Sequence, residues 1–297
     1  MTSVLYDEPG PRARRRARIA TVVGLLLILA LVAVAVRRLD ERGQFERELW
    51  APLIDPSDET FPRVWELIGQ GVVATLTAAG LAIAASIVVG ILLGTARMLT
   101  GRAGRVPIVG FIELFRGLPV IITIVFVWRA FEELGIDIGF LPGDDGLWYL
   151  VIGLTLYNSV IIAEILRAGV QSLPSGQREA ALAVGMSERT TMRLVLLPQA
   201  FRVMLPALIS QLVVVLKDTS LAALVALYTE TLRTGQRLYQ TLDNPIQVLF
   251  VIGVLFIVVN YTLSKIAVWV ERRLSRSTTT SGDAAAVKAA GGAGSIG

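Results

Sequence analysis

Six apolar stretches of the chain are long enough to cross a hydrocarbon core of about 30 Å, at about 1.5 Å of helix per residue. They run from Ile19 to Val36, about Arg63 to Ala96, Ile108 to Phe131, Gly146 to Ala168, Val203 to about Thr229, and Pro245 to Val270. The second stretch has no charge from Gly71 onward. The pattern predicts an all-α, polytopic membrane helix bundle of about six transmembrane helices.

Composition supports this prediction and removes most enzyme chemistry. The 297 residues are 54% hydrophobic, and their mean hydropathy of +0.65 is far above that of a soluble domain. No Cys and no His is present, which excludes disulfides, thiolate nucleophiles, Cys/His metal sites and histidine acid–base catalysis. None of the lysines, Lys217, Lys265 and Lys288, completes a G-x-x-x-x-G-K-[ST] phosphate-binding loop.

The net charge of +4 does not indicate nucleic-acid binding, because the basic residues cluster beside apolar spans. Segments 1–18, 97–107, 167–202 and 271–297 hold 17 of the 28 Lys and Arg residues. The alternate segments 37–63, 132–145 and 230–244 hold 5, 0 and 2. By the positive-inside rule, the first set is cytoplasmic and the second external. We expect a multi-pass cell-membrane protein with both termini in the cytoplasm.

The two ends of the chain differ from the central part. A basic cytoplasmic N-terminus (1–18) precedes an extra helix and external loop (19–62). We interpret that helix as an uncleaved anchor, because no small-x-small cleavage site precedes an acidic mature start. The tail 273–297 is rich in Ser, Thr, Ala and Gly from Ser277 onward and is expected to be disordered in the cytoplasm.

The cytoplasmic loop 172–198 is longer than a simple connection needs. Pro174 and Ser175 open a short helix, and Gly185 stands where a left-handed residue would end it. Ser187 is placed to cap a second short helix that ends at Pro198. These residues alone leave two interpretations open, a solvated connector or a folded binding hairpin.

The loop resembles that of a known family. Glu179-Ala180-Ala181, Gly185 and Val195-x-Leu197-Pro198 match the E-A-A-x3-G-x9-I-x-L-P pattern of ATP-binding cassette (ABC) importer permeases. Val195 replaces the usual Ile, and Met186 stands beside Gly185 where Leu is common. Flanking stretches resemble the polar amino-acid branch over roughly residues 65–272, and "SVLYDEPGPRARR" is similar to the longer permease of actinobacterial glutamate importers.

The resemblance implies a permease domain at 63–272 that does no bond chemistry and binds no cofactor of its own. Its loop would form coupling helices that dock on separate ATPase subunits, which use ATP. Arg178 and Glu179 would make polar contacts there, Ala180 and Ala181 would allow close approach, and Gly185 would set the turn. Leu197 and Pro198 would complete the loop.

The same resemblance implies several partners. These are an external amino-acid-binding protein, a second permease that is identical or similar, and membrane lipid, but no nucleic acid. A polar amino acid, with glutamate favoured, is the expected substrate. The alternative is an ion-gradient-driven secondary transporter or channel, which would explain intramembrane charges but not the loop. A membrane enzyme is a poor third interpretation without His or Cys.

Charges within the fifth span need an explanation, because an intramembrane charge costs a few kcal/mol unless it faces a cavity or a partner. Lys217 and Asp218 either lock the bundle by pairing with a neighbour or line the translocation path, with Thr219 and Ser220 adding hydroxyl groups. Asn158 in the fourth span is a candidate for helix contact or for pore lining.

A second group of charges is expected near the cytoplasmic edge. Glu113 and Arg116 are three residues apart on one helical face, as are Glu164 and Arg167. A salt-bridged rim is the first interpretation, and a cytoplasmic gate is the alternative. In the third span, Gly117 and Pro119 predict a kink.

Overall fold

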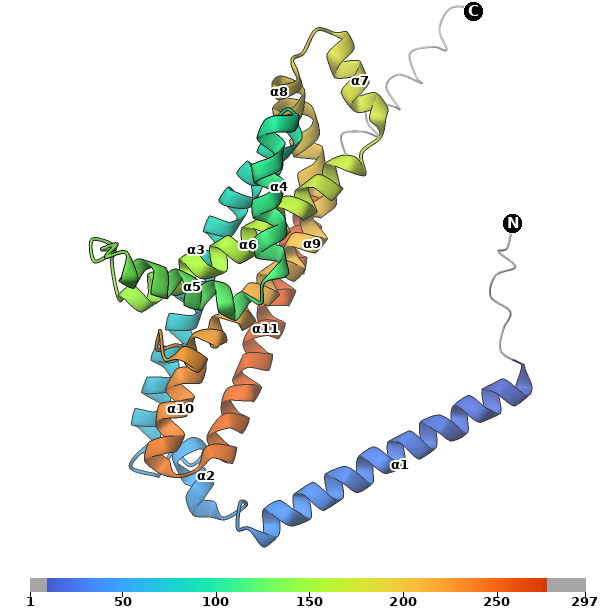
Figure 1. Cartoon of the computed structure of the whole chain (residues 1–297). Coiled ribbons are helices and arrows are strands. Elements are labelled where there is room, and N and C mark those ends of the chain that lie inside the picture. The colour runs from blue at the N-terminus through green and yellow to red at the C-terminus, as the bar shows by residue number, and fades with distance from the viewer. Residues whose placement is uncertain (1–9, 277–297) are drawn as a thin grey trace, which may run out of the picture.

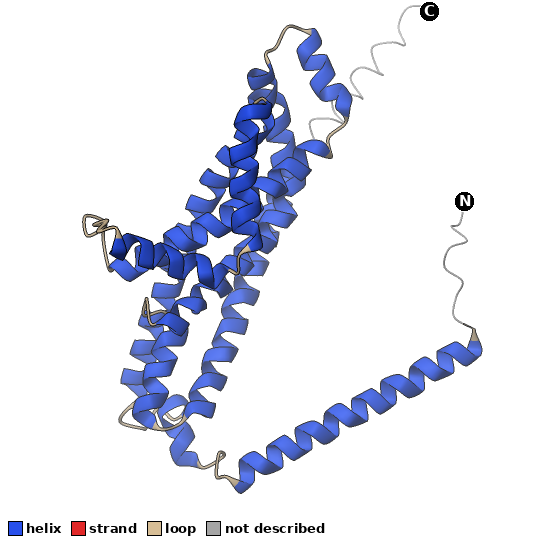
Figure 2. Ribbon diagram, in the orientation of Figure 1, coloured by secondary structure: helices blue, strands red, loops and turns tan. Residues whose placement is uncertain are grey.

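The computed structural model describes residues 10–276, which form a helical bundle with no strand in that range (Figure 2). The α-helices are α1 Pro11–Glu41, α2 Arg47–Ile54, α3 Phe61–Leu99, α4 Arg102–Gly117, α5 Val120–Glu133, α6 Asp145–Gln171, α7 Ser175–Ala183, α8 Glu188–Thr191, α9 Leu197–Asp218, α10 Thr231–Leu242 and α11 Pro245–Arg276. A π-helical turn, η1 Met192–Leu196, and a 3₁₀ segment, η2 Thr219–Val225, flank α9. Helix α11 includes the first residues of the tail expected to be disordered, and the remainder of that tail lies outside the described residues.

Five helical stretches of the described chain are long and apolar enough to cross a membrane, and α4 with α5 forms a sixth if that bent pair is counted as one span. This agrees with the prediction of about six spans. The first of them, α1, extends away from the bundle, and none of its residues is buried (Figure 1). Its apolar side chains therefore need lipid or another protein around them, as a membrane anchor does.

Small residues allow the two central helices to pack closely. On α3, Ala78, Ala82, Ser86, Gly90 and Gly94 form one buried stripe. A Cβ atom on Gly90 would lie 2.7 Å from Ile162 of α6, and one on Gly94 would lie 3.0 Å from the Ala163 carbonyl oxygen. Backbones that approach this closely are typical of membrane helices, where van der Waals contact replaces the hydrophobic effect.

The third predicted span is broken rather than kinked. The chain bends by 111° between α4 and α5, so the Ile108 to Phe131 stretch is not one straight crossing. Pro119 has no amide hydrogen and forces the residue before it out of the helical region, and Leu118 is accordingly extended at φ −90°, ψ 143°. The position of the break was predicted, but its size was not.

The fifth predicted span is also different from the expectation. The helix does not end at Pro198, because α8, η1 and α9 follow one another from Glu188 to Asp218, and 3₁₀ turns continue to Val225. The π-helical turn η1 lies directly before Pro198, and the wider turn accommodates a residue that cannot donate a backbone hydrogen bond. The second helix of the loop is therefore the start of the long helix that re-enters the bundle.

At the end of the bundle opposite α7 and α8, partly buried hydrogen bonds hold the linker that follows α1 (Figure 1). Trp65 donates to the Leu53 carbonyl at 3.0 Å, Asn244 to the Leu49 carbonyl at 2.7 Å, and Gln247 to the Gln44 carbonyl at 2.6 Å. These bonds satisfy backbone oxygens of α2 and its flanks, so the linker is fastened to α3 and α11.

Candidate functional site

The loop 172–198 forms a folded hairpin at one end of the molecule, beyond the ends of α3, α4 and α9 (Figure 1). Gly185 adopts φ +86° after α7, as predicted for the residue that reverses the chain. Ser187 caps α8 by accepting a hydrogen bond from the Thr190 amide, also as predicted. The loop is therefore a folded element and not an extended connector.

The two arms of the hairpin are joined by an ion pair that the sequence did not reveal. The Nε and Nη2 groups of Arg178 on α7 each donate to one carboxylate oxygen of Glu188 on α8. Arg178 thus has an internal partner, whereas exposed Glu179 has no ion pair or side-chain hydrogen bond within residues 10–276. Ala181 is buried within the hairpin, and Ala180 faces solvent.

The exposed surface of the hairpin includes large apolar side chains. Val184, directly before Gly185, is 79% exposed, and Leu194 is 60% exposed. Leu197 is half-buried, and Pro198 is exposed on the first turn of α9. Exposed apolar residues on a folded hairpin are typical of a protein–protein contact surface.

A break in helical geometry lies where the sequence placed its intramembrane charges. Helix α9 ends at Asp218, the chain continues as 3₁₀ turns through Val225, and Ala226 has a left-handed φ of 54°. Lys217 is exposed and lines a groove of about 490 Å³ with Ser220 and Asn260. Within the described chain neither Lys217 nor Asp218 has an ion-pair partner, so the bundle itself does not neutralise them.

The two hydroxyl groups of this segment are used locally. Thr219 is fully buried and donates to the Leu216 carbonyl at 2.7 Å, and Ser220 donates to the Lys217 carbonyl at 2.7 Å. Both bonds satisfy carbonyl oxygens at the end of α9, where the α-helical pattern stops. Of the two, only Ser220 lines the groove.

Asn158 lies inside the bundle, away from that groove. It is fully buried on α6, where its amide nitrogen donates to the Leu154 carbonyl at 2.8 Å and its oxygen accepts from Gln211 of α9 at 2.6 Å. In this structure Asn158 thus joins α6 to α9, and its role in transport stays a prediction.

The predicted rim residues form two different arrangements. Glu113 and Arg116 make an exposed pair on α4 at 2.8 Å. Glu164 is partly buried and is shared between Arg167, at 3.0 Å on its own helix, and Arg97 near the end of α3. Arg97, Glu164 and Arg167 thus link α3 to α6 where both helices leave the apolar core. Such a partly buried network holds its side chains more firmly than the exposed Glu113–Arg116 pair does.

The sequence interpretation missed one helix of the bundle, α10. The segment 230–244 was expected to be an external loop, but Thr231–Leu242 is a helix packed between α3 and α11. Thr231 contacts Thr75 of α3 through their hydroxyl groups at 2.7 Å, and Gly235 lies against Ile252. The buried Glu230 caps the helix by accepting from the Leu232 and Arg233 amides. Residues at i, i+3, i+4 and i+7 (Thr231, Thr234, Gly235, Leu238) are the buried face, a helical pattern that could have revealed this element.

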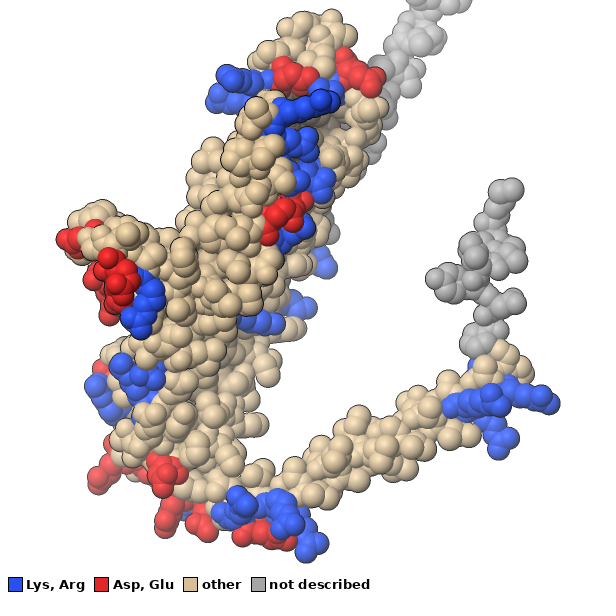
Figure 3. Space-filling model, viewed as in Figure 1, with Lys and Arg blue, Asp and Glu red and all other residues tan. Residues whose placement is uncertain are grey.

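Charge is distributed unevenly over the molecule. Basic side chains gather near the hairpin end and along the face that carries α4, whereas acidic and basic side chains lie side by side at the α2 end and at the tip beyond α5 (Figure 3). The expected orientation depends on the positions of Lys and Arg, because acidic residues contribute little to the positive-inside rule. The orientation itself stays a prediction.

A family model agrees with this arrangement of spans and hairpin. The model described as "Binding-protein-dependent transport system inner membrane component" matches residues 86–276. The chain belongs to this family. It is accordingly a multi-pass membrane permease, a transport component and not an enzyme.

Two curated relatives extend the likeness beyond the matched region. The permease is 38% identical over 240 residues to the glutamate transport system permease protein GluD of Corynebacterium glutamicum, covering 80% of this chain and 83% of the relative. It is 32% identical over 212 residues to the glutamine transport system permease protein GlnP of Escherichia coli K12, covering 70% and 93%. Both relatives are permeases of amino-acid transport systems by name.

Solved structures agree on the fold. A crystal structure of an amino acid ABC transporter with histidines superposes with a TM-score of 0.64 at 25% identity, covering 72% of this chain and 97% of that chain. An inward-facing structure of the MetNI methionine ABC transporter superposes with a TM-score of 0.59 at 22% identity, covering 71% and 97%. The permease therefore has the helical architecture of ABC importer subunits.

Proposed function

We propose that this permease carries a polar amino acid, with glutamate favoured, through an ABC importer in which separate ATPase subunits dock on the hairpin 174–198. The braced hairpin carries the proposal. Arg178 and Glu188 hold its two arms, and Glu179 and Val184 are left exposed at its surface. Because α8, η1 and α9 form one continuous helix, a push on the hairpin would be transmitted directly to the groove beside Lys217.

The assembly needs partners that this chain does not supply. Two bound ATPase subunits closing on ATP would move the hairpins, and a second permease, identical or similar, would complete the pathway across the membrane. A separate external protein would deliver the substrate. The family description, which specifies a binding-protein-dependent system, supports that delivery step. The chain itself would bind no cofactor.

Glutamate is favoured for two reasons. The relative that covers 80% of the chain, GluD, is a glutamate permease by name. In addition, Lys217 is an exposed cation on the wall of the groove, where a carboxylate could replace part of the water that solvates it. Lys217 and Ser220 are therefore our candidates for the translocation path. Asp218 is half-buried at the end of α9, where it could bind the substrate ammonium group.

The ATPase docking can be tested with two matched charge reversals. Glu179→Arg lies on the hairpin, and Glu133→Arg lies at the exposed end of α5, away from the hairpin; neither carboxylate has an ion pair within residues 10–276. The detergent-solubilised wild type and the Glu133→Arg control should co-purify with an ABC ATPase, and Glu179→Arg should not. A second hairpin variant, Val184→Asp, should also lose the ATPase. If no ATPase accompanies the wild type, or if both hairpin variants retain it, the docking assignment is wrong.

The same preparations separate the importer from a gradient-driven transporter. Proteoliposomes that hold the permease, its partner subunits and ATP should take up radiolabelled glutamate when the binding protein is present outside. Glutamate uptake driven by a proton or sodium gradient without any ATPase would instead support the secondary-transporter alternative. ATP-dependent uptake of glutamine in preference to glutamate would retain the importer and change only its substrate.

A further inference from the structure

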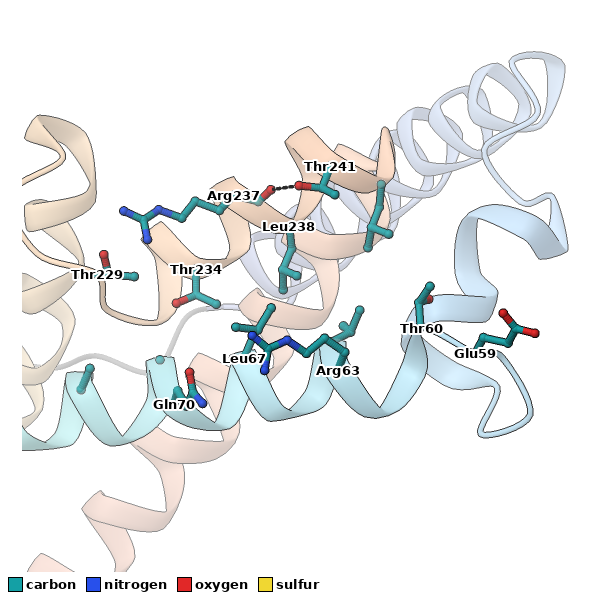
Figure 4. A pocket seen from close by; sticks show the side chains of 14 residues that line it. Glu59, Thr60, Arg63, Leu67, Gln70, Thr229, Thr234, Arg237, Leu238 and Thr241 are labelled. Carbon is teal, nitrogen blue, oxygen red and sulfur yellow. Dashed lines mark hydrogen bonds between the residues drawn. The ribbon is translucent and has the colours of Figure 1, made fainter.

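A groove separate from the one beside Lys217 runs between α3 and α10, toward the α2 end of the bundle. Its volume is about 700 Å³. In Figure 4, side chains of the two helices face one another across it, with Leu67 of α3 and Leu238 of α10 between them. Its lining also includes Val64, Ala74 and Leu242, so much of its wall is apolar.

Two arginines stand on opposite walls of this groove. Arg63 comes from α3 and Arg237 from α10, and both are exposed. Arg63 pairs with Glu66 at 2.7 Å on the protein surface. The Arg237 guanidinium has no ion-pair or hydrogen-bond partner among residues 10–276, although its backbone carbonyl accepts from Thr241. Glu59 is the one acidic residue of the lining, so the lined surface keeps a net charge of +1.

The depth of the groove can be estimated from the contact between Thr231 and Thr75. Arg237 lies six residues beyond Thr231, about 9 Å along α10 toward the α2 end. The charge-free part of α3 begins at Gly71, only about 6 Å from Thr75 in the same direction. Arg237 is thus just past the edge of the apolar stretch, and Arg63 is farther out, at the level where lipid headgroups replace acyl chains.

Helices α3 and α10 are in close contact at Gly71, beside the groove, whose lining continues inward to Ala74 and Thr229. A Cβ atom added to Gly71 would lie 2.7 Å from the Thr234 hydroxyl and 3.1 Å from the Thr231 Cα. The cavity is therefore a slot with an apolar wall and a cationic mouth, and it opens toward the headgroup layer.

We propose that this slot binds one anionic phospholipid from the leaflet at the α2 end. Its phosphate lies between Arg237 and Arg63, and one acyl chain lies along Leu67, Ala74 and Leu238. Arginine matches a phosphate through paired hydrogen bonds, and an apolar wall needs an apolar partner once it is in the membrane.

A free amino acid would share only the anionic part of this chemistry. Its carboxylates could contact the arginines, but the cavity is several times larger than such a molecule and its wall would stay uncovered. The arginines favour an anionic group and the apolar wall favours a hydrocarbon chain, and a phospholipid has both.

Native mass spectrometry of the full chain in detergent, titrated with phosphatidylglycerol or phosphatidylcholine, tests the assignment. The wild type should bind one phosphatidylglycerol with a preference over phosphatidylcholine of about fivefold, as expected for one net positive charge, because Glu66 already pairs with Arg63 and Glu59 also lines the groove. Arg63→Gln with Arg237→Gln should reduce the preference to about twofold or less. Arg47→Gln with Arg129→Gln, which removes two exposed arginines outside the slot, should leave the preference unchanged.

The acyl-chain contact is tested by filling the wall. Ala74→Phe should weaken binding of both lipids by about tenfold, since it removes the space for most of one chain's contact. Ala84→Phe, at an exposed site on the same helix, should have no such effect.

Several results would overturn the proposal. They are an unchanged lipid preference in the double arginine variant, unchanged binding in Ala74→Phe, and displacement of the lipid by glutamate through the same two arginines. The last would assign the slot to the amino acid. Lipid carried by the monomer but absent from a dimer would assign the slot to contact between two copies of the chain.

Discussion

The bond between Asn158 and Gln211 is a direct test of how the bundle is held together. Asn158 is fully buried on α6, and its oxygen accepts from the Gln211 amide of α9 at 2.6 Å. If this bond is a helix–helix contact, the Asn158→Ala and Gln211→Ala variants should each reduce stability, and the two effects should not add.

The expected magnitude comes from the environment of the pair. Losing one partner leaves a buried amide group unsatisfied, which costs about 1–3 kcal/mol in the interior of a soluble protein. Interhelical bonds in membranes average about 0.6 kcal/mol and reach about 1.7, because the unfolded helices also find partners. At 2.6 Å and with one member fully buried, this pair should lie in the upper half of that range, at about 1–1.5 kcal/mol of coupling.

The assay is a double-mutant cycle on the free energy of unfolding in mixed micelles, carried out on the full chain. The Ser210→Ala variant is the matched control, because its exposed hydroxyl bonds only to the Pro206 carbonyl of its own helix. Transport kinetics are measured on the same four proteins. A coupling energy below about 0.3 kcal/mol between Asn158 and Gln211, together with an altered KM for the substrate, would refute the packing role. Asn158 would then be assigned to the translocation path.

Two further predictions concern the helix packing. Gly153→Val should lower the free energy of unfolding by about 1–3 kcal/mol, and the thermal midpoint with it, since a Cβ at that position would lie 2.7 Å from the Ile124 Cα. Gly80→Val is the control, because a Cβ there has nothing within 4 Å. Equal losses in the two variants would contradict the close approach of α5 and α6. Pro119→Ala should let α4 and α5 straighten from 111°, seen as a longer distance between spin labels at positions 106 and 130, and an unchanged distance would mean that tertiary contacts, not Pro119, hold the bend.

Features with a local physical cause could be predicted from the sequence. An apolar run crosses the membrane because its own side chains are apolar, whatever lies beside it, so α3, α6 and α11 agree with their predicted ranges to within a few residues. The turn at Gly185, the cap at Ser187 and the break before Pro119 are also local, because each depends on the backbone chemistry of one or two residues.

The sequence led to a wrong prediction at Pro198, because a neighbouring turn compensates for the hydrogen bond that proline cannot donate. Pro198 was expected to end a helix, but the π-helical turn η1 before it absorbs the missing hydrogen bond, and the chain continues to Val225. The fifth span therefore begins in the hairpin. That continuity links the docking surface to the groove beside Lys217, and it changes how the hairpin would act on the pathway.

Tertiary structure alone decided which side chains are partners. Glu164 could be paired with Arg167 from helical spacing, but its contact with Arg97, 67 residues away, depends on how α3 packs on α6. Gln211 and Asn158 are separated by 53 residues, and Thr75 and Thr231 by 156. The apolar pattern sets which residues enter the membrane, but it does not set which helices become neighbours, because lipid and protein interior are almost equally apolar. Close contacts at small residues such as Gly71, Gly90 and Gly153 make that choice, and they exist only once the helices are assembled.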